Sequence, residues 1–329
     1  MSKLLIKLID CFFLLRFPLL APVWTILVLG WATSNSQVCV GGTFTPECIL
    51  WAQESFLWIS LIGFSLIVAS IYVVNQIVDI ESDRLNGKLF LLPNGIISIR
   101  GAWIVALLCA TGGMLIAVLF FDLWMALLYG LGMVLGILYN LPPASLKNRA
   151  WGGMFANLAG HGIITYLVGW YTARFVLPES TASLDAALLS SLSPGLANAA
   201  VYITTTIADM EGDEKVGKKT FAVLYGQRWT AFSAALLCAA TLVISFYLPY
   251  NAWVMVVPTV ISLALFISLI FRPEKQQAFR AFKWPVFLLT ASVTAFTPMY
   301  GILIIFTFFL SRLYYRWRFS IEYPTFKAQ

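Results

Sequence analysis

Residues 55–83 read SFLWISLIGFSLIVASIYVVNQIVDIESD, an uncharged apolar run that ends in a cluster of acidic residues. About 20 apolar residues in a helix are enough to cross the hydrocarbon core of a bilayer, so residues 55–78 predict a membrane-spanning helix. A second apolar run, near 187–208, ends in the similar cluster Asp209-Met210-Glu211-Gly212-Asp213, and each cluster is followed by a Gly-Lys pair. We interpret the two runs as pseudo-repeated halves with a site near their shared axis. The alternative is chance similarity between two loop entrances.

The composition extends this interpretation to all 329 residues. Hydrophobic residues make up 60% of the chain and charged residues 11%, whereas a soluble domain carries about a quarter charged residues. The bilayer must therefore be the main solvent, and we predict an all-α integral membrane protein with a single transmembrane domain over residues 1–329. About nine membrane helices are expected, in two pseudo-repeated four-helix halves. They lie near 17–34, 55–78, 101–120, 122–140, 153–173, 187–208, 230–248, 252–271 and 285–311.

The basic residues indicate an orientation in the membrane. Lys and Arg concentrate in the loops after the second, fourth, sixth and eighth segments, while the other loops hold almost none apart from Arg174. Nine spans with a cytoplasmic N-terminus predict this alternation. The tail disagrees, because Arg312, Arg316 and Arg318 would then lie outside. The net charge is +6, and the positions of the basic residues indicate membrane orientation. No nucleic-acid surface is expected. The chain is expected to be a multi-pass protein of a bacterial or archaeal cell membrane.

The acidic clusters have a spacing that suits metal and phosphate chemistry. Asn75, Asp79 and Asp83 are spaced i, i+4, i+8 and share one helix face, and Asp209 and Asp213 are spaced i, i+4. Like charges at that spacing repel one another and are costly near hydrocarbon, so we expect a cation to neutralise them. Mg²⁺ commonly bridges carboxylates to substrate phosphates. The alternative is a pair of solvated helix ends at the interface.

Three motifs together resemble those of the UbiA superfamily of intramembrane prenyltransferases. The first cluster resembles its N-x-x-x-D-x-x-x-D motif, and the second its later aspartate motif, followed by Gly217-Lys218-Lys219-Thr220. The stretch Tyr139-Asn140-Leu141-Pro142-Pro143-Ala144-Ser145-Leu146-Lys147 is similar to the family's Tyr-…-Pro-Pro-…-Lys loop. The resemblance implies a nine-helix bundle and transfer of an isoprenyl group from an isoprenyl diphosphate to a lipophilic acceptor, such as a quinone precursor, an aromatic compound or a polar-lipid headgroup.

The resemblance assigns roles to particular residues. Asn75, Asp79, Asp83, Asp209 and Asp213 are the expected catalytic residues, and the four aspartates are the expected ligands of Mg²⁺ through the diphosphate. Tyr139, Lys147, Lys218 and Lys219 are the expected substrate-binding residues, although ordinary loop charges and an interfacial tyrosine are the alternatives for them. Departures occur at Thr205, where many members are acidic, and at Phe90-Leu91-Leu92-Pro93-Asn94-Gly95, where many have Arg-Pro-x-Pro. These departures leave the acceptor undetermined.

Two alternative functions fit the same motifs. A transporter with repeated halves is one alternative, but its acidic residues usually lie near mid-bilayer and these lie beside basic loops. A terpene cyclase of the same superfamily is another. His161 is the only histidine. We expect it to make a structural hydrogen bond, and a role as a base or ligand is the alternative. Cys39 and Cys48 fall in a loop without Lys or Arg, and we predict that they form a disulfide in an oxidising outer compartment. Two free thiols in a loose loop are the alternative.

Overall fold

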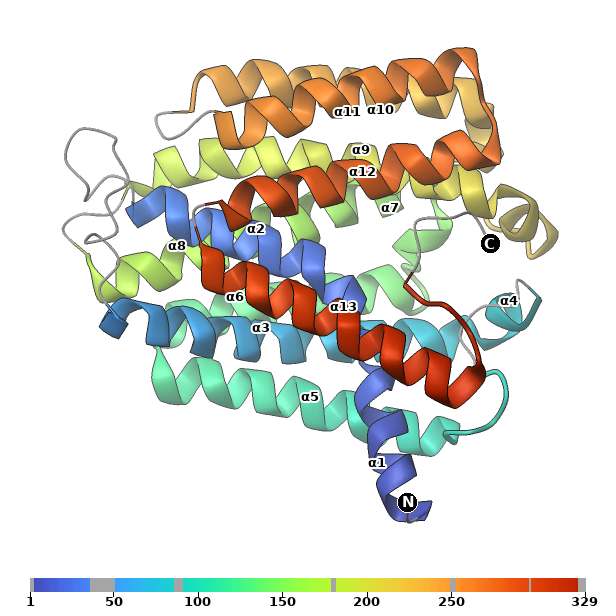
Figure 1. Cartoon of the computed structure of the whole chain (residues 1–329), viewed down its shortest axis with the longest axis horizontal. Helices are drawn as coiled ribbons and strands as arrows, with labels where there is room; N and C mark the ends of the chain where they lie inside the picture. Colours follow the sequence, from blue (N-terminus) through green and yellow to red (C-terminus); the bar gives the residue numbers. More distant parts are fainter. Residues whose placement is uncertain are drawn as a thin grey trace.

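The protein forms a bundle of long helices that run side by side (Figure 1). The computed structural model describes residues 3–35, 51–85, 91–178, 182–248, 253–295 and 297–324. The predicted Cys39–Cys48 disulfide and the Gly87-Lys88 pair lie outside these residues. The helices are α1 (Lys3–Leu14), α2 (Phe17–Asn35), α3 (Trp51–Val78), α4 (Ile80–Leu85), α5 (Ile99–Phe120), α6 (Leu123–Asn140), η2 (Leu146–Asn148), α7 (Ala150–Asn157), η3 (Leu158–Ile164), α8 (Thr165–Val176), α9 (Leu184–Lys215), α10 (Phe221–Phe246), α11 (Trp253–Phe271), α12 (Lys275–Thr294) and α13 (Pro298–Phe319).

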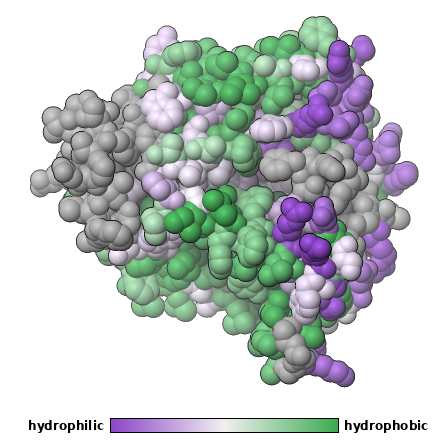
Figure 2. All heavy atoms as spheres, viewed as in Figure 1, coloured by the Kyte–Doolittle hydropathy of each residue, from purple (hydrophilic) through white to green (hydrophobic). Residues whose placement is uncertain are grey.

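Apolar composition and local caps explain these helices. Within the described residues, eight helices are long and apolar enough to cross a membrane: α2, α3, α5, α6, α9, α10, α11 and α13. Polar residues begin several of them: the Asp122 carboxylate accepts hydrogen bonds from the backbone N–H groups of Trp124 and Met125 at the start of α6, and Ser98 caps α5 in the same way. Figure 2 shows apolar residues across the middle of the molecule and hydrophilic ones toward the end that carries α4 and the C-terminal part of α13. The predicted all-helical membrane bundle is confirmed.

Small residues allow the closest helix contacts in the bundle. A Cβ atom at Gly169 of α8 would overlap the carbonyl oxygen of Leu27 in α2, and one at Gly30 of α2 would overlap the carbonyl oxygen of Tyr166 in α8. Glycine is therefore required on both sides of this crossing. Small residues at helix interfaces are typical of membrane bundles, where close backbone approach increases van der Waals contact.

The ninth predicted segment, 285–311, is wrong as a single span. The structure divides it into α12, which ends at Thr294, and α13, which begins at Pro298. Proline disfavours helical backbone at the residue before it, so Pro298 begins a new helix. The error has a physical cause: α12 carries Lys275, Arg280 and Lys283 in its first half, and its low apolarity concealed a helix of full length.

The position of α13 shows on which face of the bundle the C-terminal tail lies. The Asp10 carboxylate of α1 accepts a hydrogen bond from the Tyr314 hydroxyl at 2.8 Å and pairs with the Arg318 guanidinium at 3.1 Å. Phe319 packs in the same cluster as Ile77, near the first acidic motif. The end of α13, the N-terminal helix and the acidic motif therefore share one face, and the tail charges that disagreed with nine spans agree with the basic loops once α13 is counted.

Candidate functional site

The first acidic motif occupies successive turns of one helical path. The Asp79 N–H donates to the Asn75 carbonyl at 3.0 Å, and the Asp83 N–H donates to the Asp79 carbonyl at 2.8 Å. Backbone bonding of the helical i→i−4 type therefore continues from α3 into α4. The expected shared face is confirmed for these residues, and Glu81, which falls off that face, is exposed.

The second acidic motif ends α9 and turns the chain back on itself. The Lys218 N–H donates to the Asp213 carbonyl and the Gly217 N–H to the Glu214 carbonyl, at 2.9 and 3.1 Å. This pair of bonds is a Schellman motif. Gly217 has φ of +73°, a left-handed conformation that glycine adopts without a Cβ penalty. The motif directs the Lys218 side chain back over the last turn of its own helix.

Two lysines bring the two acidic motifs and the central loop together. The Lys147 ammonium lies 2.7 Å from the Asp79 carboxylate. The Lys218 ammonium lies 3.4 Å from Asp79 and 3.5 Å from Asp213, so it bridges the two halves of the chain. A backbone bond joins the loops that carry these lysines, since the Lys219 N–H donates to the Asn148 carbonyl at 3.0 Å. We call this group of Asp79, Lys147, Asp213 and Lys218 the lysine–aspartate cluster.

The two lysines differ in their electrostatic environment. The Lys147 side chain is only 6% exposed, and burial lowers its pKa more than the neighbouring Asp79 carboxylate raises it. At Lys218 burial also lowers the pKa, but the combined effect of the Asp79 and Asp213 carboxylates is larger and the pKa is raised. The two carboxylates therefore favour the charged form of Lys218, whereas at Lys147 burial outweighs its single carboxylate partner.

The donor set fits a Mg²⁺ ion that is shared with a phosphate ligand. Among the described residues, no three His, Cys, Asp or Glu side chains come close enough to hold a metal ion by themselves. Asp79 and Asp213 nevertheless face the same ammonium from two helices. Mg²⁺ is usually bound through one or two carboxylates, water and substrate phosphates, without an all-protein cage. The residues present suit that mode of binding.

The remaining predicted residues lie around this cluster. Asn75 donates from its side-chain amide to the Asn140 side-chain oxygen at 2.8 Å, and Asn140 is fully buried against α3. Asp83 and Asp209 are partly accessible. Each acts electrostatically within the cluster, Asp83 on Lys147 and Asp209 on Asp213.

Tyr139 and Lys219 make further contacts within the protein. The Tyr139 ring meets the Tyr202 ring of α9 edge-on, with centroids 6.5 Å apart, and its hydroxyl bonds with Tyr202. Lys219 is exposed, and its backbone, rather than its ammonium, joins the two loops.

Two functional candidates escaped the sequence motifs. Tyr72 lies on α3 seven residues before Asp79, and Tyr202 lies on α9 seven residues before Asp209. The repeat therefore extends two turns farther than its acidic residues, and this equivalence is the signal that could have identified both tyrosines. Tyr72 contacts His161, with the Tyr72 hydroxyl oxygen 3.0 Å from His161 Nε2. The expected structural hydrogen bond of His161 is confirmed, and no sequence pattern indicated its partner.

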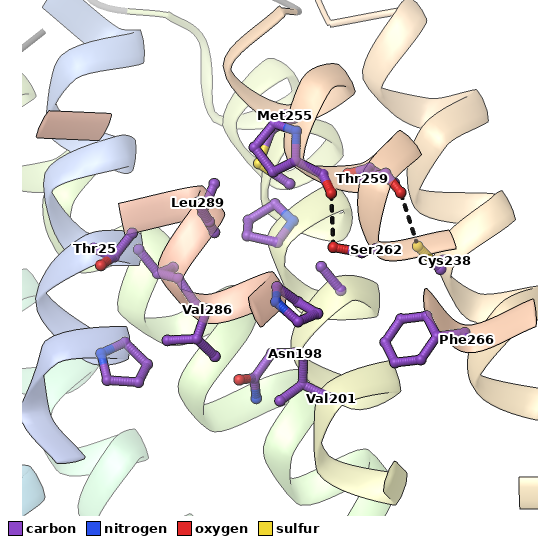
Figure 3. A pocket seen from close by; sticks show the side chains of 16 residues that line it. Thr25, Asn198, Val201, Cys238, Met255, Thr259, Ser262, Phe266, Val286 and Leu289 are labelled. Carbon is purple, nitrogen blue, oxygen red and sulfur yellow. Dashed lines mark hydrogen bonds between the residues drawn. The ribbon is translucent and has the colours of Figure 1, made fainter. Parts of the chain in front are cut away.

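An apolar pocket lies deeper in the bundle than the cluster. Figure 3 shows Thr25, Val286 and Leu289 on one side of it and Cys238 and Phe266 on the other. Each proline beyond the first turn of a described helix lines this pocket: Pro22, Pro194, Pro258 and Pro285, from α2, α9, α11 and α12. A proline removes one helical hydrogen bond and bends the helix. Four helices that each contain such a proline thus line one apolar space.

Comparisons with known families and solved structures agree with this fold. The model of the UbiA prenyltransferase family matches residues 23–293. A UbiA homolog from Archaeoglobus fulgidus, solved bound to DMAPP and Mg²⁺, superposes with a TM-score of 0.64 at 18% identity and covers 87% of this chain and 98% of its own. The match to the family model ends at residue 293, before α13 begins at Pro298.

Curated relatives act on different acceptors, as their names state. A probable homogentisate phytyltransferase 2 of Oryza sativa subsp. japonica is 29% identical over 237 residues, 69% of this chain and 61% of the relative. A homogentisate phytyltransferase of Synechocystis is 28% identical, with 49% and 53% covered. A digeranylgeranylglyceryl phosphate synthase of Methanoculleus marisnigri is 28% identical, with 69% and 74% covered. The chain thus spans only about half to three-fifths of the two phytyltransferases.

Proposed function

Because this chain belongs to the UbiA prenyltransferase family, we propose that it transfers an isoprenyl group from an isoprenyl diphosphate to a lipophilic acceptor. The observation that carries the proposal is the bridge that Lys218 forms between Asp79 and Asp213, with Lys147 on the other side of Asp79. Two ammonium groups and two carboxylates from both halves of the chain then meet at one point. A diphosphate with its metal needs both kinds of charge in the same place.

The chain's own residues bind and orient the diphosphate in this proposal. Lys147 and Lys218 exchange their carboxylate partners for phosphate oxygens, which would free Asp79 and Asp213 to act as ligands of the metal. Mg²⁺ supplies electrostatic stabilisation of the leaving diphosphate when it is bound between phosphate and carboxylates. The Asn148–Lys219 backbone bond holds the two lysine loops at a fixed separation.

The apolar pocket receives the isoprenyl chain in this proposal. The pocket lies deeper in the bundle than the cluster. Asn198 and Val201 of α9 line it, and Asp209 follows Val201 by about two turns on the same helix. Burying the chain among Val286, Leu289 and Phe266 excludes water, and the reactive allylic carbon is then protected from hydrolysis.

The protein is an integral multi-pass membrane protein, and we propose that its acidic motifs, N-terminus and C-terminal tail face the cytoplasm of a bacterial or archaeal cell. The charge of the loops supports this orientation, because Lys147, Lys218 and Arg318 belong to the face that carries the lysine–aspartate cluster. Relatives come from plastids, a cyanobacterium and archaea.

The test is prenyl transfer in isolated membranes. Membranes that contain the protein receive labelled farnesyl or geranylgeranyl diphosphate, Mg²⁺ and a panel of phenolic and glycerol-phosphate acceptors, and products are identified by mass spectrometry. Asp79→Ala, Asp83→Ala, Asp209→Ala and Asp213→Ala should each remove most activity while the protein still inserts, and EDTA should stop turnover until Mg²⁺ is restored.

The matched controls are Glu81→Ala and Glu211→Ala. Each removes an exposed acid from the same acidic stretch, and each should retain activity close to the unaltered protein. Full activity of Asp79→Ala or Asp213→Ala would refute the proposed site.

A further inference from the structure

The only histidine of the chain lies inside the bundle, away from the lysine–aspartate cluster. His161 belongs to η3, a π-helical stretch between α7 and α8. Such stretches are uncommon and often occur at functional sites. His161 and Tyr72 are both partly accessible, and their contact joins η3 to α3.

The hydrogen bonds of Tyr72 determine which nitrogen of His161 carries the proton. The Tyr72 hydroxyl donates to the Leu19 carbonyl of α2 at 3.0 Å and lies 3.0 Å from His161 Nε2. A phenol has one proton, and a carbonyl can only accept. With that proton donated to Leu19, His161 must donate through Nε2–H. The neutral imidazole then has its lone pair on Nδ1, and Nδ1 has no hydrogen-bond partner among the residues that the structure describes.

The pair lies where an acceptor must approach the reactive carbon. Tyr72 precedes Asp79 by seven residues, two helical turns, and therefore lies on the same face about 10 Å deeper in the bundle. The diphosphate binds at the level of Asp79 in the proposed function, and the first carbon of the isoprenyl chain projects from it toward the interior. A nucleophile that attacks this carbon lies between the cluster and the Tyr72–His161 pair.

Transfer to an aromatic acceptor releases one proton, and the carboxylates near the diphosphate are poor candidates to accept it. In the proposed function the four motif aspartates, Asp79, Asp83, Asp209 and Asp213, are committed to the metal–diphosphate unit. Asp10, the other buried aspartate, is held by Arg318 and Tyr314. His161 is the neutral base that is left in the described interior.

We propose that His161 Nδ1 accepts the hydroxyl proton of a phenolic acceptor, with Tyr72 as the positioning residue that fixes the histidine tautomer; this inference rests on the proposed function. The phenol gives its proton to Nδ1, and the phenolate ring carbon bonds to the first carbon of the isoprenyl group. The carbon–oxygen bond to diphosphate breaks and its electron pair leaves with the diphosphate. The dienone product tautomerises to the phenol without net proton change, and the imidazolium later releases its proton to water.

The experiment compares His161→Gln and Tyr72→Phe with a matched control in detergent-solubilised full-length protein. The glutamine amide can still donate to Tyr72 but is not a base. Tyr129→Phe is the control for Tyr72→Phe, because it also removes a buried hydroxyl that donates to a backbone carbonyl, that of Ser60 at 3.0 Å. Turnover is measured with two phenols, one that is un-ionised at the assay pH and one whose electron-withdrawing substituent leaves it ionised. Binding of a non-reactive thiolodiphosphate analogue is measured by calorimetry.

The expected result is a fall in kcat of about 10²–10⁴-fold for His161→Gln with the un-ionised phenol, a fall of less than about tenfold with the ionised phenol, and unchanged affinity for the analogue. Tyr72→Phe should lose part of the same activity, and Tyr129→Phe none. Equal losses with both phenols, or a parallel loss of analogue affinity, would assign His161 a structural role and overturn the inference. Wild-type turnover of His161→Gln would overturn it as well. If the unaltered protein prenylates no acceptor at all, the proposed function itself fails.

Discussion

Replacing Asp79 with asparagine should destabilise the protein because it leaves the Lys147 ammonium buried without its carboxylate. The two charges are 2.7 Å apart, and their side chains are 6% and 15% exposed. At an effective dielectric constant of about 20, such a pair has a Coulomb energy of about 6 kcal/mol, which desolvation largely offsets. Removing one partner of a buried pair typically costs about 3–5 kcal/mol.

The loss of unfolding free energy in Asp79→Asn has an upper limit, because Lys147 can release its proton. Doing so at pH 7, from an ordinary lysine pKa of about 10.4, costs about 4.6 kcal/mol. Lys218 keeps Asp213 as a partner and adds little to the loss. We therefore expect Asp79→Asn to lower the free energy of unfolding by about 3 kcal/mol at pH 7, and Lys147→Met in the same background to restore much of it.

The loss of unfolding free energy in Asp79→Asn should become smaller as the pH rises. Burial already lowers the pKa of Lys147, and without Asp79 the pKa falls further. Between this folded-state pKa and about 10.4 the unfolded chain binds more protons than the folded one, so stability rises with pH by up to about 1.4 kcal/mol per unit. The deficit of Asp79→Asn should therefore shrink between pH 7 and pH 9.5.

The assay is SDS-induced unfolding in mixed micelles at both pH values, followed by tryptophan fluorescence. Glu81→Gln, which removes an exposed carboxylate from the adjoining α4, is the control and should unfold as the unaltered protein does. The reasoning is refuted if Asp79→Asn unfolds at the same SDS fraction as the unaltered protein at pH 7, or if its deficit is the same at pH 9.5.

Two further variants test the loops and the helix packing. Lys147→Ala should raise the KM for isoprenyl diphosphate at least tenfold with little change in the KM for the acceptor. Lys219→Ala should change the KM for isoprenyl diphosphate by less than about threefold, because Lys219 is exposed and contacts the neighbouring loop through its backbone. In steady-state kinetics, an effect of Lys147→Ala on the acceptor alone would remove Lys147 from the diphosphate site. Gly169→Ala should lower the free energy of unfolding by about 2 kcal/mol or more, since its methyl group overlaps the carbonyl of Leu27. Gly130→Ala, with open space around the added carbon, should be neutral in the same unfolding assay, and equal behaviour of the two would contradict the packing argument.

Local patterns in the sequence were sufficient for the membrane class and for most helices. Apolar length predicts a span because hydrocarbon leaves the backbone no partner outside the helix, and residues 55–78 and 253–271 follow that rule. The spacing of Asn75, Asp79 and Asp83 determined that they share a face, because helical periodicity depends only on neighbours along the chain. The same rule failed at α12, whose Lys275, Arg280 and Lys283 concealed a helix that tertiary contacts with α2, α9 and α11 hold in the bundle.

Only the tertiary structure decided which side chains meet. Lys218 is 139 residues from Asp79 along the chain, and His161 is 89 residues from Tyr72. Nothing in either local pattern specifies such a partner, because the approach depends on how helices cross, on the Schellman turn at Gly217 and on the Asn148–Lys219 bond. The sequence by itself determined that acids and lysines would lie on one face of a helical membrane bundle. The packing of the helices decided that Lys218 would bridge the two halves, because contact between distant segments is a property of the whole fold.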